Sequence, residues 1–306
     1  MSRIGIVIVA YNSGEEIGAC LDAALGTGAE IVVVDNASTD RTVQETESRG
    51  VVLIANRTNR GFAAAVNQGF AALNCTHILL LNPDAVIQTS LEPLREACDL
   101  PGAAGAGGCL LDHDGRPQIG FMARQLPTAK SLALEALLLN RICPNNPVNR
   151  RYRELGRDYG ARFEVQQPAG AFLMLHRTVW QMLGGFDEKF YPLWFEDVDF
   201  CRRVADRGYV LYYEPRAVAK HTGAHSISAL TVEKRRFYWY RSLLKYSAKH
   251  FHPFAFRGVC LAVAAGSVLR MIAESILQRR FRPMAANWDV VRLAGRCLVA
   301  GCRTDQ

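Results

Sequence analysis

Three carboxylates stand within four residues in the second half of the chain. Glu196, Asp197 and Asp199 follow the aromatic stretch Phe190–Phe195, and apolar residues then recur with helical spacing. We therefore predict a loop-to-helix junction, where apolar walls and free backbone N–H groups can hold a general base. Helix capping is the alternative, since acids in a first helical turn contribute ~0.5–2 kcal/mol without any chemistry.

Other polar residues stand at the ends of predicted strands. Apolar runs at 4–10, 31–34, 51–54 and 77–81 alternate with helical segments, a pattern typical of right-handed βαβ units and a mostly parallel sheet. Ligands bind beyond the carboxyl ends of such strands. The candidate donor-binding residues there are Ala10, Tyr11, Asn12, Asp35, Asn36, Asn82 and Asp84.

Two of these groups suit a nucleotide. Asp35 and Asn36 can hydrogen-bond a nucleobase and ribose, although Asn and Asp also suit ordinary turns. After the third strand, Gly61 and the alanines behind it allow a helix N-terminus to approach a diphosphate, and Arg60 adds positive charge. An Ala-rich packing face is the alternative, but it does not explain Asn67 in the same helix.

A divalent cation has candidate ligands at the end of the fourth strand. Asn82 and Asp84 are two residues apart, so their oxygen atoms can face the same way. His221 is predicted in a glycine-containing loop after a strand at 210–213, and imidazole with carboxylate suits Mn²⁺ or Mg²⁺. A turn and a structural histidine are the alternatives, and His225 is the alternative ligand.

The remaining candidates concern an acceptor. A strand at 168–176 is entered through small residues that include Gly170, and it leads to Trp194, Phe195 and Asp199, which we assign to an acceptor pocket. Residues 141–162 are rich in Asn, Pro and Arg, so we predict a mobile, irregular loop beside that pocket. A turn at 112–117 fits a short hairpin near the sheet.

Composition sets the broad class. A chain of 306 residues that is 49% hydrophobic can bury a large core. Its nine cysteines are scattered without a C-x-x-C pair, so neither a disulfide framework nor a zinc site is expected and a reducing cytoplasm fits best. The first apolar run lacks a cleavage site, so we expect no signal peptide.

Charge divides the chain in two. Residues 1–232 hold 22 Lys/Arg against 25 Asp/Glu, whereas residues 233–306 hold 14 against 4. We predict a catalytic domain at 1–232, with a donor half at about 1–100 and an acceptor half at about 101–232, and a basic, amphipathic helical extension at 233–306. The uncharged run 258–269 has only 12 residues and a span needs about 20, so the extension is expected to lie on an anionic bilayer surface. Docking on the catalytic domain is the alternative.

The motifs together resemble the family 2 glycosyltransferases with the GT-A fold, most closely the rhamnosyltransferase-like branch, over about residues 3–250. The motifs that carry the resemblance are Asn59-Arg60-Gly61-Phe62, Asn67-Gln68-Gly69, Asn82-Pro83-Asp84, Gly185-Phe186-Asp187-Glu188 and Glu196-Asp197-Val198-Asp199.

The resemblance implies a role for single residues. Asp35 would contact the base of a sugar nucleotide, and Asp84 would bind the diphosphate-bridging metal as the last residue of a D-x-D motif. Asn82 occupies the first position of that motif, which leaves one carboxylate fewer and gives His221 more weight. Asp197 would be the general base of the Glu-Asp pair, with Glu196 beside it.

We therefore expect an inverting glycosyltransferase that uses Mg²⁺ or Mn²⁺ and no covalent glycosyl-enzyme. Family likeness favours dTDP-L-rhamnose as donor, with a UDP-sugar as the alternative, and a lipid-linked or cell-surface glycan, such as a polyprenyl-diphosphate-linked one, as acceptor. The expected location is cytoplasmic, peripheral on the inner face of the plasma membrane. Homo-oligomerisation stays open.

Three other classes fit less well. A dinucleotide oxidoreductase requires G-x-G-x-x-G, and the turn at Ala10–Gly14 carries one glycine. A nucleotidyltransferase wants a Gly-rich, basic loop at the same place. A non-catalytic, basic-tailed module for nucleic acid or a membrane surface leaves the strands ending in Asp35 and Asp84 without a purpose, and these acids oppose phosphates, so no nucleic-acid partner is expected.

Overall fold

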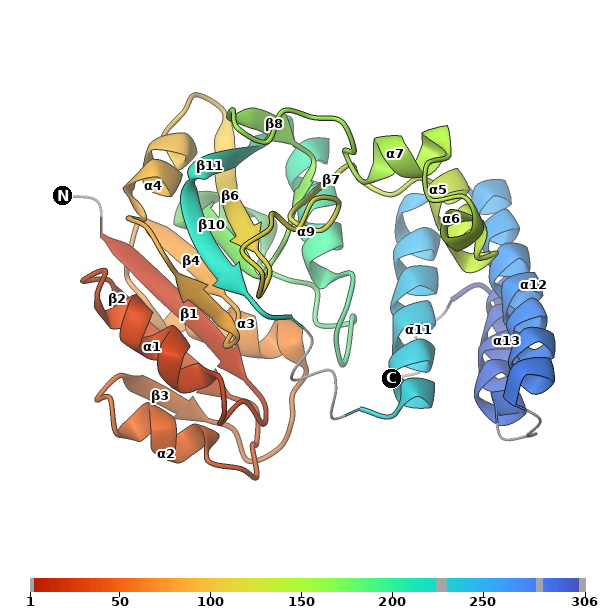
Figure 1. The fold of residues 1–306 in the computed structure, drawn as a ribbon, viewed down its shortest axis with the longest axis horizontal. Helices are drawn as coiled ribbons and strands as arrows, with labels where there is room; N and C mark the ends of the chain where they lie inside the picture. Colours follow the sequence, from red (N-terminus) through yellow and green to blue (C-terminus); the bar gives the residue numbers. More distant parts are fainter. Residues whose placement is uncertain (1–2, 224–229, 279–282, 303–306) are drawn as a thin grey trace. The chain divides into compact units, whose positions relative to one another are not determined.

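The computed structural model describes residues 3–223, 230–278 and 283–302. Two compact units make up the chain (Figure 1). The first, here called the sheet unit, comprises residues 1–126, 153–192 and 196–229. The second, the helical unit, comprises residues 127–152, 193–195 and 230–306. The predicted catalytic domain and extension differ from these units mainly at 127–152 and 193–195, which group with the C-terminal helices.

The sheet unit is built on one large mixed sheet in the order β3-β2-β1-β4-β10-β6-β11-β5, with β8 paired to β11. The strands are β1 (Ile4–Ala10), β2 (Glu30–Asp35), β3 (Val52–Ala55), β4 (His77–Leu81), β5 (Ala85–Ile87), β6 (Ala103–Leu111), β8 (Phe163–Val165), β10 (Phe172–His176) and β11 (Val210–His221). A small second sheet pairs β7 (Ala123–Arg124) with β9 (Gln167–Pro168). The predicted parallel strands β1 to β4 are confirmed.

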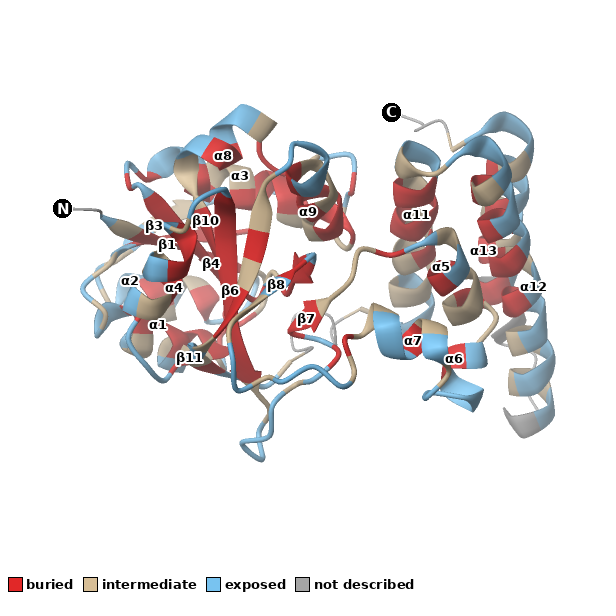
Figure 2. Ribbon diagram, turned by 90° about the horizontal axis from the view of Figure 1, so that it is seen from above, coloured by how far each residue is buried: buried red, intermediate tan, exposed pale blue. Residues whose placement is uncertain are grey.

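Helices cover both faces of this sheet, as Figures 1 and 2 show: α1 and α4 lie on one face, and α3, α8 and α9 on the other. The helices are α1 (Ile17–Leu25), α2 (Thr42–Glu47), α3 (Phe62–Ala72), α4 (Glu92–Cys98), α8 (Arg177–Leu183) and α9 (Glu196–Asp206). The central strands β1, β4 and β10 are almost wholly buried (Figure 2), and they are apolar because helices cover both of their faces.

The antiparallel strand β10 lies between β4 and β6. Close approach explains the Gly/Ala-rich sequence of β6. A Cβ on Gly105 would lie 2.4 Å from the carbonyl oxygen of Met174, and one on Gly108 would lie 2.3 Å from the ring of Phe172. Small residues in β6 therefore allow β10 to enter the sheet.

The helical unit contains α5 (Ala129–Ala136), α6 (Leu139–Ile142), α7 (Pro147–Tyr152), α11 (Val232–His250), α12 (Pro253–Gln278) and α13 (Pro283–Ala300). The prediction of an irregular loop at 141–162 is wrong for residues 147–152, which form α7. Asn146 accepts a hydrogen bond from the Asn149 amide at 2.9 Å, and Pro147 occupies the first helical turn, so the Asn/Pro-rich sequence starts a helix.

Helix α12 is longer than its uncharged run suggests. Residues 253–276 form a stretch of 24 residues with mean hydropathy 1.7, which is long and apolar enough to cross a membrane by length and composition. The apolar length expected from the 12 uncharged residues alone is too short, because the helix continues past Arg270. Arg270 is half-buried within the helical unit and donates to the Tyr240 hydroxyl at 3.2 Å, so its charge does not end the helix.

Candidate active site

The predicted metal ligands Asp84 and His221 lie side by side. His221 is the last residue of β11 rather than part of a loop, and its pairing opposite Ala85 brings it to the residues that follow β4. Its Nε2 is 3.4 Å from Asp84 Oδ1 and 3.4 Å from Asn82 Nδ2. Both Asp84 and His221 are buried. His225 lies outside the described residues.

The surroundings of this pair favour an ionised carboxylate. Burial of Asp84 acts to raise its pKa, but hydrogen bonding and charge from His221 outweigh it, and the pKa is held below the usual value. Sequence reasoning missed Gln118, whose Oε1 is 3.1 Å from His221 Nδ1 and whose amide donates to the His221 carbonyl at 2.7 Å. It also missed Phe121, which stacks on the His221 ring.

The side chains around Asp84 and His221 suit a divalent cation as ligands. Asp84 supplies an anionic oxygen, His221 an imidazole nitrogen and Asn82 an amide, and the three side chains converge on one place beyond the strand ends. Carboxylate oxygen with one imidazole suits Mn²⁺ and, less well, Mg²⁺.

The ends of β1 and β2 meet beside the end of β4. The Asn36 amide donates to the Ala10 carbonyl at 2.8 Å, which holds the two turns together. Asp35 is buried; its Oδ2 accepts from the Ser38 amide at 3.0 Å, whereas its Oδ1 has no hydrogen-bond partner among the described residues. A buried carboxylate oxygen without a partner is a suitable acceptor for a ligand N–H.

The turn after β1 is shaped by Asn12, which has a left-handed φ of 50°. Its Oδ1 accepts from the Thr39 amide at 2.8 Å, and its own amide donates to Ser38 Oγ at 2.8 Å. Asn12 therefore joins the first two turns, and the neighbouring Tyr11 is half-buried.

Asn36 has a structural task. Its Oδ1 accepts from the Arg60 amide at 2.9 Å, and its Nδ2 donates to the Gly61 carbonyl at 3.2 Å. The first amide of α3, that of Phe62, donates to the Pro192 carbonyl at 2.8 Å. This N–H is therefore not available to a diphosphate, while the exposed Arg60 side chain is.

Asn67 is likewise turned toward the protein. Its Nδ2 donates to the Phe186 carbonyl at 3.0 Å and to Glu188 at 3.0 Å, and its Oδ1 accepts from the Phe186 amide at 2.9 Å. These bonds fasten the segment that leads to the acidic helix. The structure does not bring Asn67 to the strand-end group.

The acids Glu196 and Asp197 open α9, as the sequence predicts. Gly170 faces Asp197 so closely that a Cβ there would lie 3.4 Å from Asp197 Oδ2, and Asp197 Oδ1 accepts from the Val198 amide at 2.8 Å. Burial raises the pKa of Asp197, and the charge of Arg124, a residue that sequence reasoning missed, opposes the rise. Burial and the neighbouring Asp197 raise the pKa of Glu196 further.

One hydrogen bond joins the acidic group to the strand-end group. The Asn82 amide donates to the Ala171 carbonyl at 3.0 Å, and Ala171 directly follows the Gly170 that faces Asp197. The edge of the sheet therefore holds the Glu196–Asp197 pair and the Asp84–His221 pair in succession.

Three residues predicted for the acceptor pocket contact other parts of the protein. Asp199 is fully buried and paired with Arg203 at 2.8 Å, four residues along α9. Trp194 and Phe195 belong to the helical unit, where Phe195 packs against Trp239 and Tyr246.

The family model described as Glycosyl transferase family 2 matches residues 5–174. The chain is a family 2 glycosyltransferase. It is 30% identical over 239 residues, 72% of this chain and 76% of the other, to the N-acetylglucosaminyl-diphospho-decaprenol L-rhamnosyltransferase of Mycobacterium tuberculosis. It is 25% identical over 211 residues, 67% of this chain and 62% of the other, to the low-salt glycan biosynthesis hexosyltransferase Agl10 of Haloferax volcanii.

Solved structures agree on the fold. The mannosyltransferase PcManGT from Pyrobaculum calidifontis, solved with GDP-Man and Mn²⁺, aligns with a TM-score of 0.55 at 16% identity over 98% of this glycosyltransferase and 87% of that chain. The predicted GT-A fold and enzyme class are confirmed.

The raised pKa of Glu196 makes a prediction for stability. Above its ordinary pKa the unfolded state releases this proton while the folded state keeps it, so wild-type glycosyltransferase is destabilised as pH rises, by ~1.4 kcal/mol for each unit of raised pKa. Glu196→Gln should therefore raise the urea midpoint at pH 7 and lose this advantage near pH 3.5. The control is Glu15→Gln at an exposed position. This expectation would be contradicted if Glu196→Gln and the wild type had the same urea midpoint at both pH values.

Proposed function

We propose that this glycosyltransferase transfers L-rhamnose from dTDP-L-rhamnose to a hydroxyl of a polyprenyl-diphosphate-linked glycan, with inversion at the anomeric carbon. The observation that carries the proposal is that Asp197 lies against Gly170, close to the Asp84–His221 pair. The hydrogen bond from the Asn82 amide to the Ala171 carbonyl joins the two groups. The name of the Mycobacterium tuberculosis relative supports the choice of sugar and acceptor class.

Asp197 is the general base. As the acceptor oxygen forms its bond to the anomeric carbon, Asp197 Oδ2, on the side of Gly170, takes the hydroxyl proton, and the bond from the anomeric carbon to the diphosphate oxygen breaks. A raised pKa makes Asp197 a stronger base than an ordinary aspartate. Glu196, whose pKa is raised further, stays protonated and leaves the negative charge on Asp197.

The donor lies across the ends of β1, β2 and β4. Asp35 Oδ1 accepts an N–H of the base, since it has no hydrogen-bond partner among the described residues. Asp84 and His221, with Asn82, would hold Mn²⁺ or Mg²⁺, which neutralises charge on the leaving diphosphate. The exposed Arg60 can add positive charge.

Replacement of the base tests the mechanism. Asp197→Asn should lower kcat by ~10²–10⁴-fold while donor affinity stays within about threefold, because the amide keeps the shape and cannot accept the proton. In the wild type, kcat/KM should fall as pH decreases, with a midpoint above the ~3.9 of an ordinary aspartate.

The assay compares dTDP-L-rhamnose with UDP-sugars on a polyprenyl-diphosphate-linked N-acetylglucosamine. Asp206→Asn, at the exposed end of the same helix, is the matched control and should turn over normally. Wild-type rates from Asp197→Asn would exclude Asp197 as base. Turnover with UDP-sugars alone would exclude the rhamnosyl donor and leave the base assignment standing.

Removal of the cation tests the Asp84 and His221 pair. Activity should vanish in excess chelator and return with Mn²⁺ or Mg²⁺, and Asp84→Ala should need at least ~10-fold more metal. Thermal stabilisation of the wild type by Mn²⁺ with a nucleoside diphosphate, absent in Asp84→Ala, gives a second readout. Full activity in chelator would rule out a cation in the reaction.

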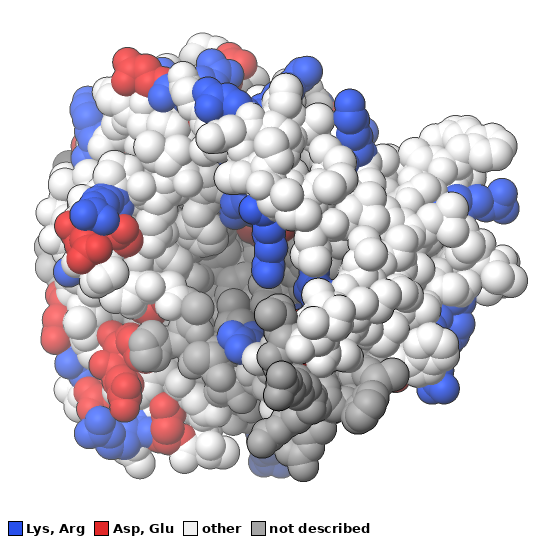
Figure 3. Space-filling model, turned by 45° about the vertical axis from the view of Figure 1, so that its right-hand side comes forward, with Lys and Arg blue, Asp and Glu red and all other residues white. Residues whose placement is uncertain are grey.

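A membrane surface is the proposed location of the acceptor. Helix α12 exposes one stripe of large apolar side chains, and contiguous apolar surface of this kind marks an interaction site. The stripe comprises Phe254, Leu261, Leu269, Ile272 and Ile276, each at least half exposed. Among the described residues on the face drawn in Figure 3, Lys and Arg lie at separate points.

Vesicle binding tests this location. Ile272→Asn with Ile276→Asn should reduce co-sedimentation with anionic liposomes by at least ~10-fold and slow turnover of a lipid-linked acceptor more than that of a short soluble one, because two apolar side chains inserted into a bilayer contribute ~3 kcal/mol. Val52→Asn on β3, where Val52 is about as exposed as Ile272, is the control. Equal binding by all variants, or none by the wild type, would remove the membrane assignment.

A further inference from the structure

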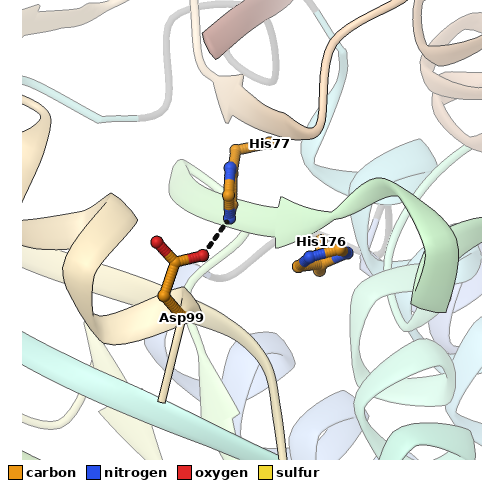
Figure 4. Close-up of side chains that lie close together, drawn as sticks. All are labelled: His77, Asp99 and His176. Atoms are coloured by element: carbon orange, nitrogen blue, oxygen red, sulfur yellow. Dashed lines mark ion pairs between the residues drawn. The ribbon is translucent and has the colours of Figure 1, made fainter. Parts of the chain in front are cut away.

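A second group of side chains that can bind a metal lies in the middle of the sheet, at the strand ends opposite those of the candidate active site. His77 is the first residue of β4, whereas Asn82 follows its last residue. At ~3.3 Å per residue, a strand of this length puts roughly 15 Å between them. The group of His77, Asp99 and His176, drawn in Figure 4, therefore has no part in binding the donor.

Strand register brings the two imidazoles together. His176, the last residue of β10, is paired directly opposite His77, so both side chains point to the same face of the sheet. Their rings lie 5.0 Å apart at 72°. Asp99 directly follows α4, and Figure 4 shows its carboxylate directed at His77.

The ligand atoms are close enough for one ion. One donor atom from each residue lies within 4.8 Å of the others, and His77 Nε2 is 3.0 Å from Asp99 Oδ1. Tetrahedral Zn²⁺ with bonds of ~2.0–2.2 Å holds its ligands about 3.4 Å apart. Small side-chain rotations suffice to close the difference.

The surroundings of His77 leave its Nε2 available to bind a metal. It is 2% exposed, and its Nε2 makes no aligned hydrogen bond among the described residues although Asp99 is near. A hydroxyl lies against Nδ1 of each ring, Thr76 at 3.1 Å from His77 and Thr178 at 2.7 Å from His176. An Nδ1–H that donates to a hydroxyl leaves the Nε2 lone pair for a metal.

Charges around the group are mixed. The buried His77 ring faces the carboxylate of Asp99, whose Oδ1 lies 3.0 Å from His77 Nε2. The guanidinium of Arg95 pairs with Asp99 Oδ2, which weakens the attraction for a cation but leaves Oδ1 toward His77.

We propose that His77, Asp99 and His176 form a site for Zn²⁺ or a similar late first-row divalent cation, with water as the fourth ligand. Two imidazoles with one carboxylate prefer such ions over Mg²⁺. The ion ties the start of β4 and the end of β10 to the end of α4. The scattered cysteines gave no indication of zinc, because the ligands come together only through strand register.

The test uses full-length protein carrying Asp84→Ala and His221→Ala, so that the active-site pair contributes no binding. Titration with Co²⁺ should show one equivalent with visible d–d absorption and without a thiolate charge-transfer band, and Zn²⁺ should displace it. Zn²⁺ should raise the melting temperature by about 5 °C. His176→Gln and Asp99→Asn, both at accessible positions, should weaken binding by at least ~100-fold while circular dichroism stays unchanged.

His113→Ala, in the exposed turn at 112–114, is the control and should bind like its parent. The proposal is overturned if the parent binds no Co²⁺ at 100 µM, if a thiolate band shows cysteine ligation, or if folded His176→Gln binds as the parent does. Activity of the active-site residues plays no part in these readouts.

Discussion

The antiparallel pairing of β10 with β4 is the constraint on which the sheet unit depends. Because Phe172 is opposite Leu81 and His176 is opposite His77, β10 starts where β4 ends and ends where β4 starts. At one edge this brings Gly170, and the Asp197 beside it, next to the residues that follow β4. At the other edge it pairs two imidazoles. One strand register thus builds both the candidate active site and the proposed zinc site, and the small residues of β6 allow it.

Much of this arrangement could be predicted from local sequence. Buried runs ending in Asn or Asp gave β1, β2 and β4 with their polar turns, and the acids before an apolar helix gave α9. What local pattern lacks is register: His221 meets Asn82 across 139 positions, and only the pairing of β11 with β5 sets that contact. Gln118 and Arg124 follow a plain turn, and nothing in their spacing distinguishes them from surface polar residues.

Several residues chosen for ligand binding turn out to hold the protein together. The side-chain amides of Asn36 and Asn67 form hydrogen bonds to other loops of the protein. The carboxylate of Asp199 pairs with Arg203. Sequence can identify a polar side chain but not its partner, because short polar residues serve loops and ligands with the same hydrogen bonds. Asp35 differs, since one of its oxygens has no hydrogen-bond partner among the described residues.

The segment 193–195 has a consequence for how the chain can be divided. Trp194 and Phe195 both adopt left-handed φ, 73° and 70°, and Ser242 of α11 donates to the Leu193 carbonyl at 3.0 Å. The backbone therefore passes through the helical unit for three residues immediately before Glu196. A fragment made without α11 would leave these residues without the contacts that support their strained conformation. The two units are interleaved along the chain, and neither can be exchanged between homologues as a simple terminal module.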